Sequence, residues 1–268
     1  MRIISNILLW LAVISTGFAV STERFELVYS GIAPSGKLHT DHTGNVYFVD
    51  DHRIIKLETA SGNTFEYGSL SAGTISSADV SNPFQILVFY RDFNRIMFLN
   101  NKLAPLRGEI DMSDLGIDKA ILAASSGQGG FWVFSDRDNR IVYFDQQLQR
   151  SHQSMIISSL ADSGNQPVYL TESRNRLYLH VPLEGIMVFD RFASYLKTIP
   201  YAGPSRFRVV DGQIIYFYQG ELISLDFEAG KISKIYMPPD VQADYADIQP
   251  ERMYILSEGR IYSYRVRQ

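Results

Sequence analysis

The segment EGRIYSYRVRQ, Glu258 to Gln268, ends the chain and decides the fold that the sequence predicts. It follows RMYILS, and both runs alternate apolar and polar residues, which is typical of paired strands with one buried face. The chain stops here one strand short of the unit that it repeats before this point. The one strand-like run left over is RFELVYS, Arg24 to Ser30. We therefore expect the two ends of the chain to pair and to close a ring.

Six segments of the chain share one pattern: an alternating apolar run, a tight polar turn and a second alternating run that opens with an aliphatic residue. An Asp, Glu or Asn often follows the second run. The aliphatic residues that mark the repeat are Ile54, Ile96, Ile141, Ile186, Leu222 and Ile261, which are 42, 45, 45, 36 and 39 residues apart. A period of about 40 residues with strand alternation predicts propeller blades, because helical repeats of similar length would space their apolar residues three and four apart.

Each predicted hairpin has one short strand before it and another after it, so each blade is predicted to have four antiparallel strands. In the first blade the strands are separated by Gly44-Asn45, Asp50-Asp51 and Gly62-Asn63, which are residue types of tight turns. The predicted fold class is therefore all-β: a six-bladed β-propeller of four antiparallel strands per blade, with the last blade closed by the N-terminal strand. It forms a single domain over residues 20–268. Alternation predicts four core positions between blades: Tyr47, Val49, Trp132 and Phe134.

Residues 1–19 have the features of a cleavable secretory signal peptide: a cation at Arg2, an apolar segment over Ile7–Ile14, and the small residues Gly17 and Ala19 before the cleavage point. The alternative is an uncleaved anchor over Ile3–Val20, a run of about 18 residues that polar side chains interrupt. Cysteine is absent, which excludes disulfides and thiol chemistry. Export without disulfides favours a bacterial periplasm, and we expect no membrane insertion after cleavage.

The charge of the mature chain bears on its partners. The signal segment carries one cation and no acid, so 24 Lys and Arg remain against 29 Asp and Glu. This acidic balance gives no reason to expect binding to nucleic acid or to an anionic membrane surface. The partner that we expect instead is a protein complex.

Two polar clusters near the N-terminus contain the side chains that divalent metals accept. The first contains His39, Asp41 and His42, and the second contains Asp50, Asp51 and His52. The two clusters lie at consecutive turns, and so at opposite ends of one sheet. We therefore do not expect them to converge, and a metal ion would need a further ligand from another blade.

Six-bladed propellers that are enzymes, such as the lactonase type, place acids and amides around a central channel, where a metal ion polarises the substrate carbonyl. The residues here that could face such a channel are Asp79, Asn82, Ser125, Ser126, Glu172 and Asp247. This set has fewer acids than a calcium site of six to eight oxygens needs, and Asp79 and Asn82 are alternatively turn caps before Pro83. His152 and His180 are isolated, and no phosphate loop or nucleophile elbow is present. We predict no catalytic residue, no cofactor and no metal site.

The hairpins resemble those of NHL-like and other six-bladed propellers, although no WD dipeptide, YWTD string or S-x-D-x-G-x-T-W box is present. Three runs, together with the signal segment, resemble a family of exported propellers found in Bacteroidota. These are SNPFQILVFYRDFNRIMFLNNKLAPL (81–106), FWVFSDRDNRIVYFD (131–145) and GIMVFDRFASYLKTIP (185–200). The resemblance implies a periplasmic accessory subunit of an envelope machine, such as the type 9 protein secretion apparatus, and brings no catalytic residues with it.

A rigid ring with variable loops at both ends is a common platform for protein binding. Our leading prediction is a non-enzymatic periplasmic scaffold that belongs to an envelope protein complex. The candidate contact loops are Ser126–Gly130, Ser159–Gln166 and Pro238–Asp244. The alternative is a propeller that uses its channel, either to bind a small molecule or glycan or to act as a lactonase-like metal-dependent hydrolase.

Overall fold

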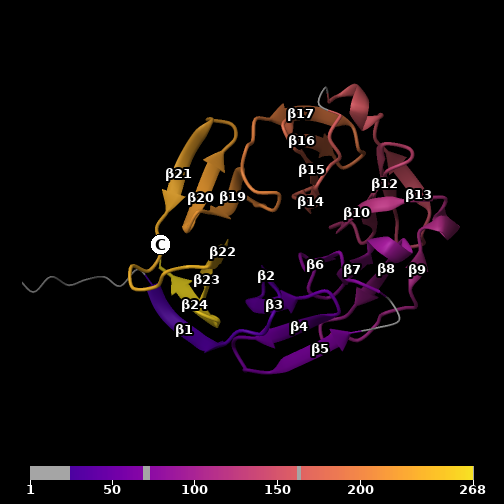
Figure 1. Cartoon of the computed structure of the whole chain (residues 1–268). Coiled ribbons are helices and arrows are strands. Elements are labelled where there is room, and N and C mark those ends of the chain that lie inside the picture. The colour runs from indigo at the N-terminus through magenta and orange to yellow at the C-terminus, as the bar shows by residue number, and fades with distance from the viewer. Residues whose placement is uncertain (1–24, 69–72, 162–163, 268) are drawn as a thin grey trace, which may run out of the picture.

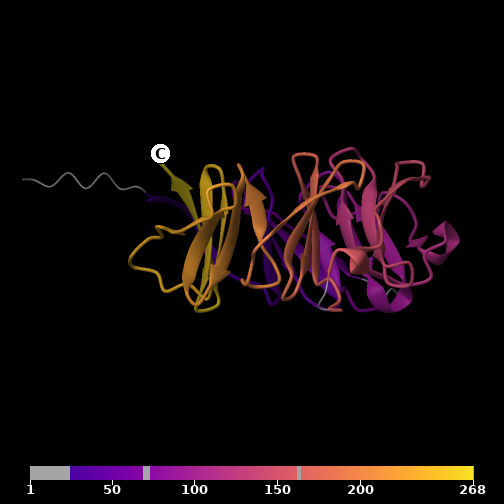
Figure 2. The ribbon, with the colours of Figure 1, turned by 90° about the horizontal axis from the view of Figure 1, so that it is seen from above.

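A computed structural model describes residues 25–68, 73–161 and 164–267, which form six four-stranded antiparallel sheets. The sheets stand side by side as the blades of a ring (Figure 1), and from the side the ring is a thick disc (Figure 2). The predicted fold class is confirmed. The predicted signal segment, residues 1–19, lies outside the described residues. In the part of the chain that the structure describes, no helix has the length and hydropathy needed to cross a bilayer.

Five blades are built from consecutive strands, in the order and at the places that the repeat predicts. Blade one contains β2 (Lys37–Thr40), β3 (Asn45–Val49), β4 (Arg53–Glu58) and β5 (Thr64–Gly68). Blade two contains β6 (Ser77–Asp79), β7 (Ile86–Tyr90), β8 (Arg95–Leu99) and β9 (Ile110–Asp111). Blade three contains β10 (Ala120–Ser125), β11 (Phe131–Ser135), β12 (Arg140–Phe144) and β13 (Arg150–Gln153). Blade four contains β14 (Tyr169–Ser173), β15 (Arg176–Val181), β16 (Gly185–Asp190) and β17 (Tyr195–Ile199). Blade five contains β18 (Arg208–Val210), β19 (Gln213–Tyr218), β20 (Glu221–Asp226) and β21 (Lys231–Ile235). Short 3₁₀ turns lie at η2 (Arg91–Phe93), η3 (Ser113–Leu115) and η4 (Ile157–Ser159).

Blade six joins the two ends of the chain. It contains β22 (Tyr245–Gln249), β23 (Arg252–Ser257), β24 (Arg260–Val266) and, as its outer strand, β1 (Phe25–Ile32). β1 pairs antiparallel with β24, from Phe25 opposite Val266 to Ile32 opposite Arg260, with one irregularity between Leu27 and Tyr29. The predicted closure by the N-terminal strand is thus confirmed.

The core is divided into six hydrophobic clusters, each of which fills the interface between two neighbouring blades. The six aliphatic residues that mark the repeat are at most 1% exposed, and the four predicted core positions are buried as well. The cluster that contains Leu38, Phe48, Tyr254 and Ile261 joins the first blade to the last. Because this last interface is filled like the others, the row of blades closes on itself.

The antiparallel order of the strands gives the ring two different faces. One face, the crossover face, carries the connections between blades and the turns between second and third strands. The described residues of these connections are 33–36, 73–76, 112–119, 154–161, 164–168, 200–207 and 236–244. The opposite face, the hairpin face, carries the turns between first and second and between third and fourth strands. Each inner strand therefore runs from the crossover face to the hairpin face.

A polar residue at the end of the third strand caps the turn that follows. Asn100, Asp145, Asp190 and Asp226 each accept two backbone N–H groups of the next few residues, at 2.8–3.0 Å. Such side-chain caps replace ladder bonds where a strand ends. The equivalent residue of blade six is Arg265, and no turn follows it because the fourth strand of this blade is β1. The repeat thus departs from its own pattern at the point where the ring closes.

Candidate functional site

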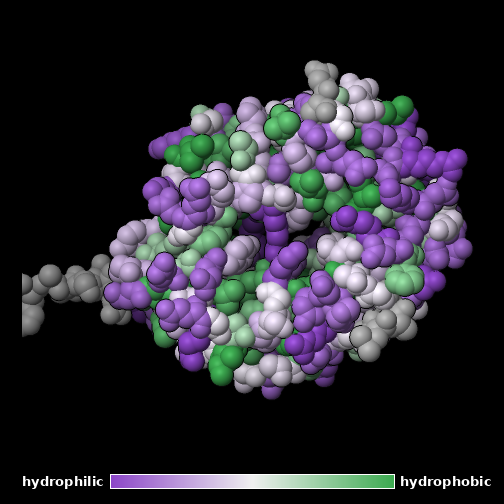
Figure 3. Space-filling view, viewed as in Figure 1, coloured by the Kyte–Doolittle hydropathy of each residue, from purple (hydrophilic) through white to green (hydrophobic). Residues whose placement is uncertain are grey.

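The inner strands of the blades surround a central channel with a volume of about 370 Å³. Figure 3 shows the hollow at the centre of the ring, with hydrophilic side chains inside it. Its wall contains residues of all six inner strands, β2, β6, β10, β14, β18 and β22. A volume of this size lies in the range of sites that hold small ligands.

The most connected polar group of the channel wall is an ion pair between Arg208 of β18 and Asp247 of β22. Arg208 donates from Nε to Oδ1 of Asp247 at 3.0 Å and from Nη2 to Oδ2 at 2.6 Å. Thr40 of β2 donates its hydroxyl to Oδ2 of Asp247 at 2.8 Å and accepts from Arg208 at 2.9 Å. Gln249 completes the cluster with a bond to the Thr40 hydroxyl at 3.0 Å. Blades five, six and one are therefore joined by polar contacts beside the closure.

The charge of Arg208 decides the protonation state of Asp247. Burial alone would raise the pKa of the Asp247 carboxyl, but the guanidinium charge and its hydrogen bonds outweigh burial and hold this pKa below its usual value. The side chain of Asp247 is 8% exposed and that of Arg208 is 24% exposed. The pair is thus ionised at neutral pH and largely shielded from water.

Two further predicted channel acids also bond to a neighbouring blade. Asp79 of blade two accepts the backbone N–H of Ser125 in blade three at 2.9 Å. Glu172 of blade four accepts the indole N–H of Trp132 at 2.5 Å and the backbone N–H of Gly127 at 3.0 Å. Both carboxylates therefore hold adjacent blades together rather than standing free in the channel.

The structure separates the predicted channel residues into two groups. Asp79, Glu172 and Asp247 line the channel, whereas Asn82, Ser125 and Ser126 do not. The alternative role as turn caps is confirmed for both Asp79 and Asn82. Asp79 accepts the backbone N–H of Ser81 at 2.9 Å, and Asn82 accepts that of Phe84 at 3.1 Å. Within residues 25–68, 73–161 and 164–267, no three His, Asp or Glu side chains gather as metal ligands.

The two N-terminal polar clusters lie apart, as the order of the turns predicts. Asp41 lies in a turn of the hairpin face, and Asp50 lies at the other end of β3 on the crossover face. Asp50 accepts the backbone N–H groups of His52 and Arg53, both at 2.9 Å, and forms an ion pair with the Arg53 guanidinium. Asp50 is therefore a turn cap.

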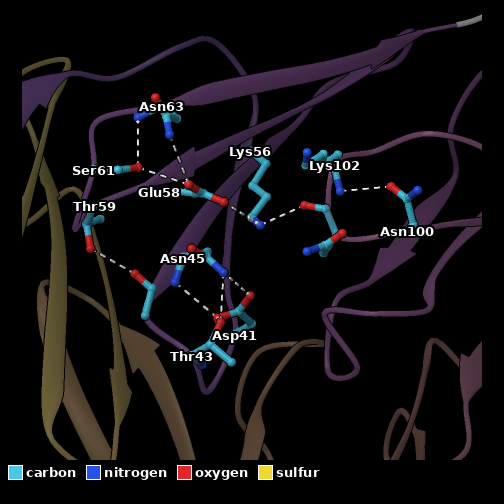
Figure 4. A network of polar contacts seen from close by, with 12 residues as sticks. Asp41, Thr43, Asn45, Lys56, Glu58, Thr59, Ser61, Asn63, Asn100 and Lys102 are labelled. Atoms are coloured by element: carbon cyan, nitrogen blue, oxygen red, sulfur yellow. Dashed lines mark hydrogen bonds and ion pairs between the residues drawn. The ribbon is translucent and has the colours of Figure 1, made fainter.

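Asp41 is the centre of a dense network on the hairpin face (Figure 4). It accepts hydrogen bonds from the backbone and side chains of Thr43 and Asn45 and from the hydroxyl of Tyr47, at 2.7–3.0 Å. Nearby, the buried Lys56 forms an ion pair with Glu58 at 3.3 Å and donates to the carbonyl of Asn101 in blade two at 2.8 Å. Asp41 therefore has a structural role in this turn.

We expect Asp41→Ala to lower the free energy of unfolding by about 2 kcal/mol, because it leaves the hydroxyl of the fully buried Tyr47 without an acceptor. Urea unfolding of the purified protein measures this loss. Asp190→Ala is the matched control, since Asp190 caps a turn through two backbone N–H groups alone and its loss should cost about 1 kcal/mol. Equal losses in the two variants would contradict the special role of Asp41. Adding Tyr47→Phe to Asp41→Ala should recover part of the stability.

The two isolated histidines are packed against aromatic rings. His180 is 5% exposed, lies edge-on to Tyr201 and Phe207, and has Nδ1 3.2 Å from the carbonyl of Ser205. Burial lowers its pKa, so the ring is neutral at pH 7. His152 stacks on Tyr143 with ring centroids 5.8 Å apart. The interpretation of His180 as a packed residue is confirmed.

Four polar residues of the channel were not predicted: the arginines Arg206 and Arg208, and Thr40 and Gln249, which are hydrogen-bonded to each other. A signal was present in RFRVV, 206–210, where two arginines alternate with an apolar residue at the start of an inner strand. Alternation with an arginine on the inward side is unusual for a core position, because a guanidinium must stay solvated or paired. Such a pattern on the innermost strand of a blade indicates a polar channel.

Comparisons with known proteins bear on the fold. Neither a protein-family model nor a curated protein matches the sequence. Among solved structures, a chain of a mitotic checkpoint complex is 9% identical with a TM-score of 0.60 over 100% of both chains. A catalytically inactive virginiamycin B lyase from Staphylococcus aureus with quinupristin is 14% identical, with a TM-score of 0.55 over 88% of this chain and 81% of that one. BamB from Moraxella catarrhalis is 12% identical, with a TM-score of 0.50 over 91% and 98%. At these identities the likeness shows the propeller fold alone.

Proposed function

We propose that this chain is a non-enzymatic periplasmic propeller that binds a protein partner through its crossover face, as a subunit of a bacterial envelope complex. The distribution of exposed apolar side chains carries the proposal. Eight of the large apolar side chains that are exposed in the described chain belong to the crossover face: Ile32, Phe93, Met155, Ile156, Val168, Leu183, Tyr218 and Tyr236. Four belong to the hairpin face: Phe84, Leu106, Phe192 and Tyr195. Apolar side chains gathered on one face are typical of a protein interface.

Leu183 is the most exposed of these apolar residues and the best evidence for a partner. It lies in the turn between β15 and β16, is 91% exposed and has a φ of 70°. A left-handed backbone costs a residue with a Cβ about 1 kcal/mol or more, and an exposed side chain recovers none of this by burial. Folding therefore does not account for a leucine at this turn, whereas contact with a partner would.

The position of the candidate loops agrees with this choice of face. Two of the three, Ser159–Gln166 and Pro238–Asp244, lie on the crossover face, although residues 162 and 163 fall outside the described chain. The third, Ser126–Gly130, is a turn of the hairpin face. In this turn Gly130 is required, because a Cβ there would lie 2.0 Å from the carbonyl oxygen of Phe144. Gly130 thus has a packing role.

Two further observations support a role in an assembly. The mitotic checkpoint complex shows that a chain of this fold occurs in a multiprotein complex, and the likeness extends over the whole of both chains. The resemblance to exported propellers of Bacteroidota supports a periplasmic location and an accessory role, with the type 9 protein secretion apparatus as the specific candidate.

We expect the tagged protein, isolated from cell envelopes in a gentle detergent, to bring down one protein partner in near-stoichiometric amount. Leu183→Asp should reduce the recovery of this partner about tenfold or more, because it places a charge in the apolar interface while Asp tolerates the left-handed backbone. Quantitative mass spectrometry of the eluate measures the ratio.

The matched control is Phe192→Asp, which changes an exposed apolar residue of the hairpin face. It should leave the recovery of the partner unchanged. Isolation of the propeller alone would overturn the proposal, and equal loss with both variants would overturn the choice of face. The location has a separate test: the intact mass of the periplasmic protein should correspond to a chain that begins at Val20.

A further inference from the structure

Four cations line the channel, Lys37, Arg91, Arg206 and Arg208, and among the described residues only Arg208 forms an ion pair. Arg206, just before β18, lines the channel and donates from Nη1 to the carbonyl of Leu38 at 2.8 Å. No carboxylate of the described residues lies within 4.0 Å of its guanidinium. A guanidinium has five N–H donors in a planar fork, so most of its hydrogen-bonding capacity is directed elsewhere. Arg208, two residues on, differs because Asp247 pairs with it.

Five of the six acids that line the channel are engaged with other groups, and the sixth, Asp51, is exposed. Asp247 is paired with Arg208, while Asp41 and Asp50 are turn caps. Asp79 and Glu172 accept hydrogen bonds from the neighbouring blade. None of these carboxylates forms an ion pair with Arg206, although Asp247 lies close enough for the charge of Arg206 to help lower its pKa.

The surroundings of Arg206 are aromatic and contain further donors. Tyr169 of β14 and Phe207 are in edge-to-face contact, with ring centroids 5.2 Å apart. Tyr245 of β22 also lines the channel, and its hydroxyl has no hydrogen-bond partner among the described residues. Burial raises the pKa of both tyrosines, and the charge of Arg206 acts in the opposite direction, which places the guanidinium near both rings. The guanidinium thus stands among rings contributed by three adjacent blades.

The first blade adds His39 to this group. Burial lowers the pKa of the His39 imidazole well below its usual value, and the charges of three nearby cations add to the effect. These cations are Arg206, Arg208 and Lys37. The imidazole is therefore neutral at pH 7, and the potential at this part of the channel is positive.

We propose that the channel at Arg206 binds a carboxylate carried on an aromatic or other apolar group, with the Arg206 guanidinium holding the carboxylate and the rings of Tyr169 and Tyr245 enclosing the apolar part. Arginine binds carboxylates through two parallel N–H···O bonds, which fits its free donors here. The inner strands Lys37–Thr40, Tyr169–Ser173 and Tyr245–Gln249 all start at the crossover face. The site can thus take either a free aromatic acid or the C-terminal residue of a protein chain. The inference does not depend on the proposed partner.

Isothermal titration of the purified exported protein tests both sources. The first arm uses benzoate and 3-phenylpropionate, with benzyl alcohol as the neutral counterpart. The second arm uses a five-residue peptide that ends in phenylalanine, with a free or an amidated C-terminus. We expect at least one of the two carboxylates to bind and its neutral counterpart not to bind. The arm that binds more tightly identifies the source.

Arg206→Gln should weaken the binding of the carboxylate at least tenfold, and Arg206→Lys should give an intermediate loss because it keeps the charge without the planar fork. Arg260→Gln, a change of an exposed arginine at the start of β24, should leave binding unchanged. Binding that is equal in wild type and Arg206→Gln, or no binding of any probe at millimolar concentration, would overturn the proposal.

A second readout needs no variant of Arg206. A bound anion offsets the positive potential, so saturation with the carboxylate should raise the pKa of His39, measured by NMR on its imidazole C2 proton and assigned with a His39→Gln variant. An unchanged pKa of His39 at saturation would show that the probe binds elsewhere and would refute this site.

Discussion

Removal of β1 (Phe25–Ile32) is expected to abolish the cooperative unfolding transition of the whole ring. The deletion exposes the backbone of β24 along the full pairing from Phe25 to Ile32 and removes Tyr29 from the cluster between the first and last blades. Several ladder bonds at about 1 kcal/mol each, together with lost apolar burial, approach the 5–15 kcal/mol that stabilises a typical domain. Urea unfolding, followed through Trp132 fluorescence, measures the loss. Trp132 lies in blade three, far along the ring from the closure, so an unchanged transition there would mean that closure is only local.

A covalent link between β1 and β24 should, conversely, stabilise the protein. Glu26 and Arg265 face each other across β1 and β24, and they are separated by 239 positions in the sequence. Since the chain has no cysteine, Glu26→Cys with Arg265→Cys can form a single defined disulfide. A crosslink over so long a loop raises the free energy of unfolding by up to about 5 kcal/mol in the chain-entropy model. The gain should disappear on reduction and be absent from the matched Glu26→Ser and Arg265→Ser variant.

Arg208→Met is expected to lower the free energy of unfolding by about 3 kcal/mol. The change leaves the Asp247 carboxylate in a buried position with the Thr40 hydroxyl but without its cation. Breaking one side of a buried ion pair costs about 3–5 kcal/mol, and the 24% exposure of Arg208 places this pair at the lower end. Thermal and urea unfolding of the purified protein give the difference.

The partner variant separates the loss of the pair from the burial of a lone charge. Arg208→Met combined with Asp247→Leu should have a free energy of unfolding within about 1 kcal/mol of wild type, because no unpaired charge remains.

The pH dependence of the free energy of unfolding is a second test of the ion pair. The folded pKa of Asp247 lies below 3.8, so the stabilisation by Arg208 is fully present above that pH and is lost as the pH falls through the folded pKa. The gap between wild type and Arg208→Met should therefore narrow in acid, and a constant gap would contradict the ion-pair account.

The fold could be predicted from the sequence because every blade of a propeller repeats the same pattern of strand alternation and turn residues. Alternation within each hairpin places Ile54, Ile141 and their equivalents in the core, and an acid at the end of the third strand indicates the next turn. Closure followed from the same pattern, since the last unit lacks a strand. These signals lie within one blade, so no long-range information was needed.

The channel could not be predicted to the same extent. Thr40 and Asp247 are hydrogen-bonded although 207 positions separate them, and no local pattern links two inner strands on either side of the closure. The predicted functional candidates were acids, yet Asp79 and Glu172 join blades, while Arg206 has no ion-pair partner among the described residues. Whether a charge is free depends on neighbours from several blades, which the repeat does not specify.

The closure of the ring also determines on which face a fusion or a surface attachment at either chain end will lie. Phe25 lies opposite Val266 at the hairpin end of blade six, so both ends of the ring leave it on the side away from Leu183. An affinity handle, a fluorescent reporter or a lipid tether fused to either end would stand clear of the crossover face. Protein attached to a sensor chip through such a handle would present the crossover face to solution. A circularly permuted chain with its new ends at 112–119 would instead place its handle on the crossover face.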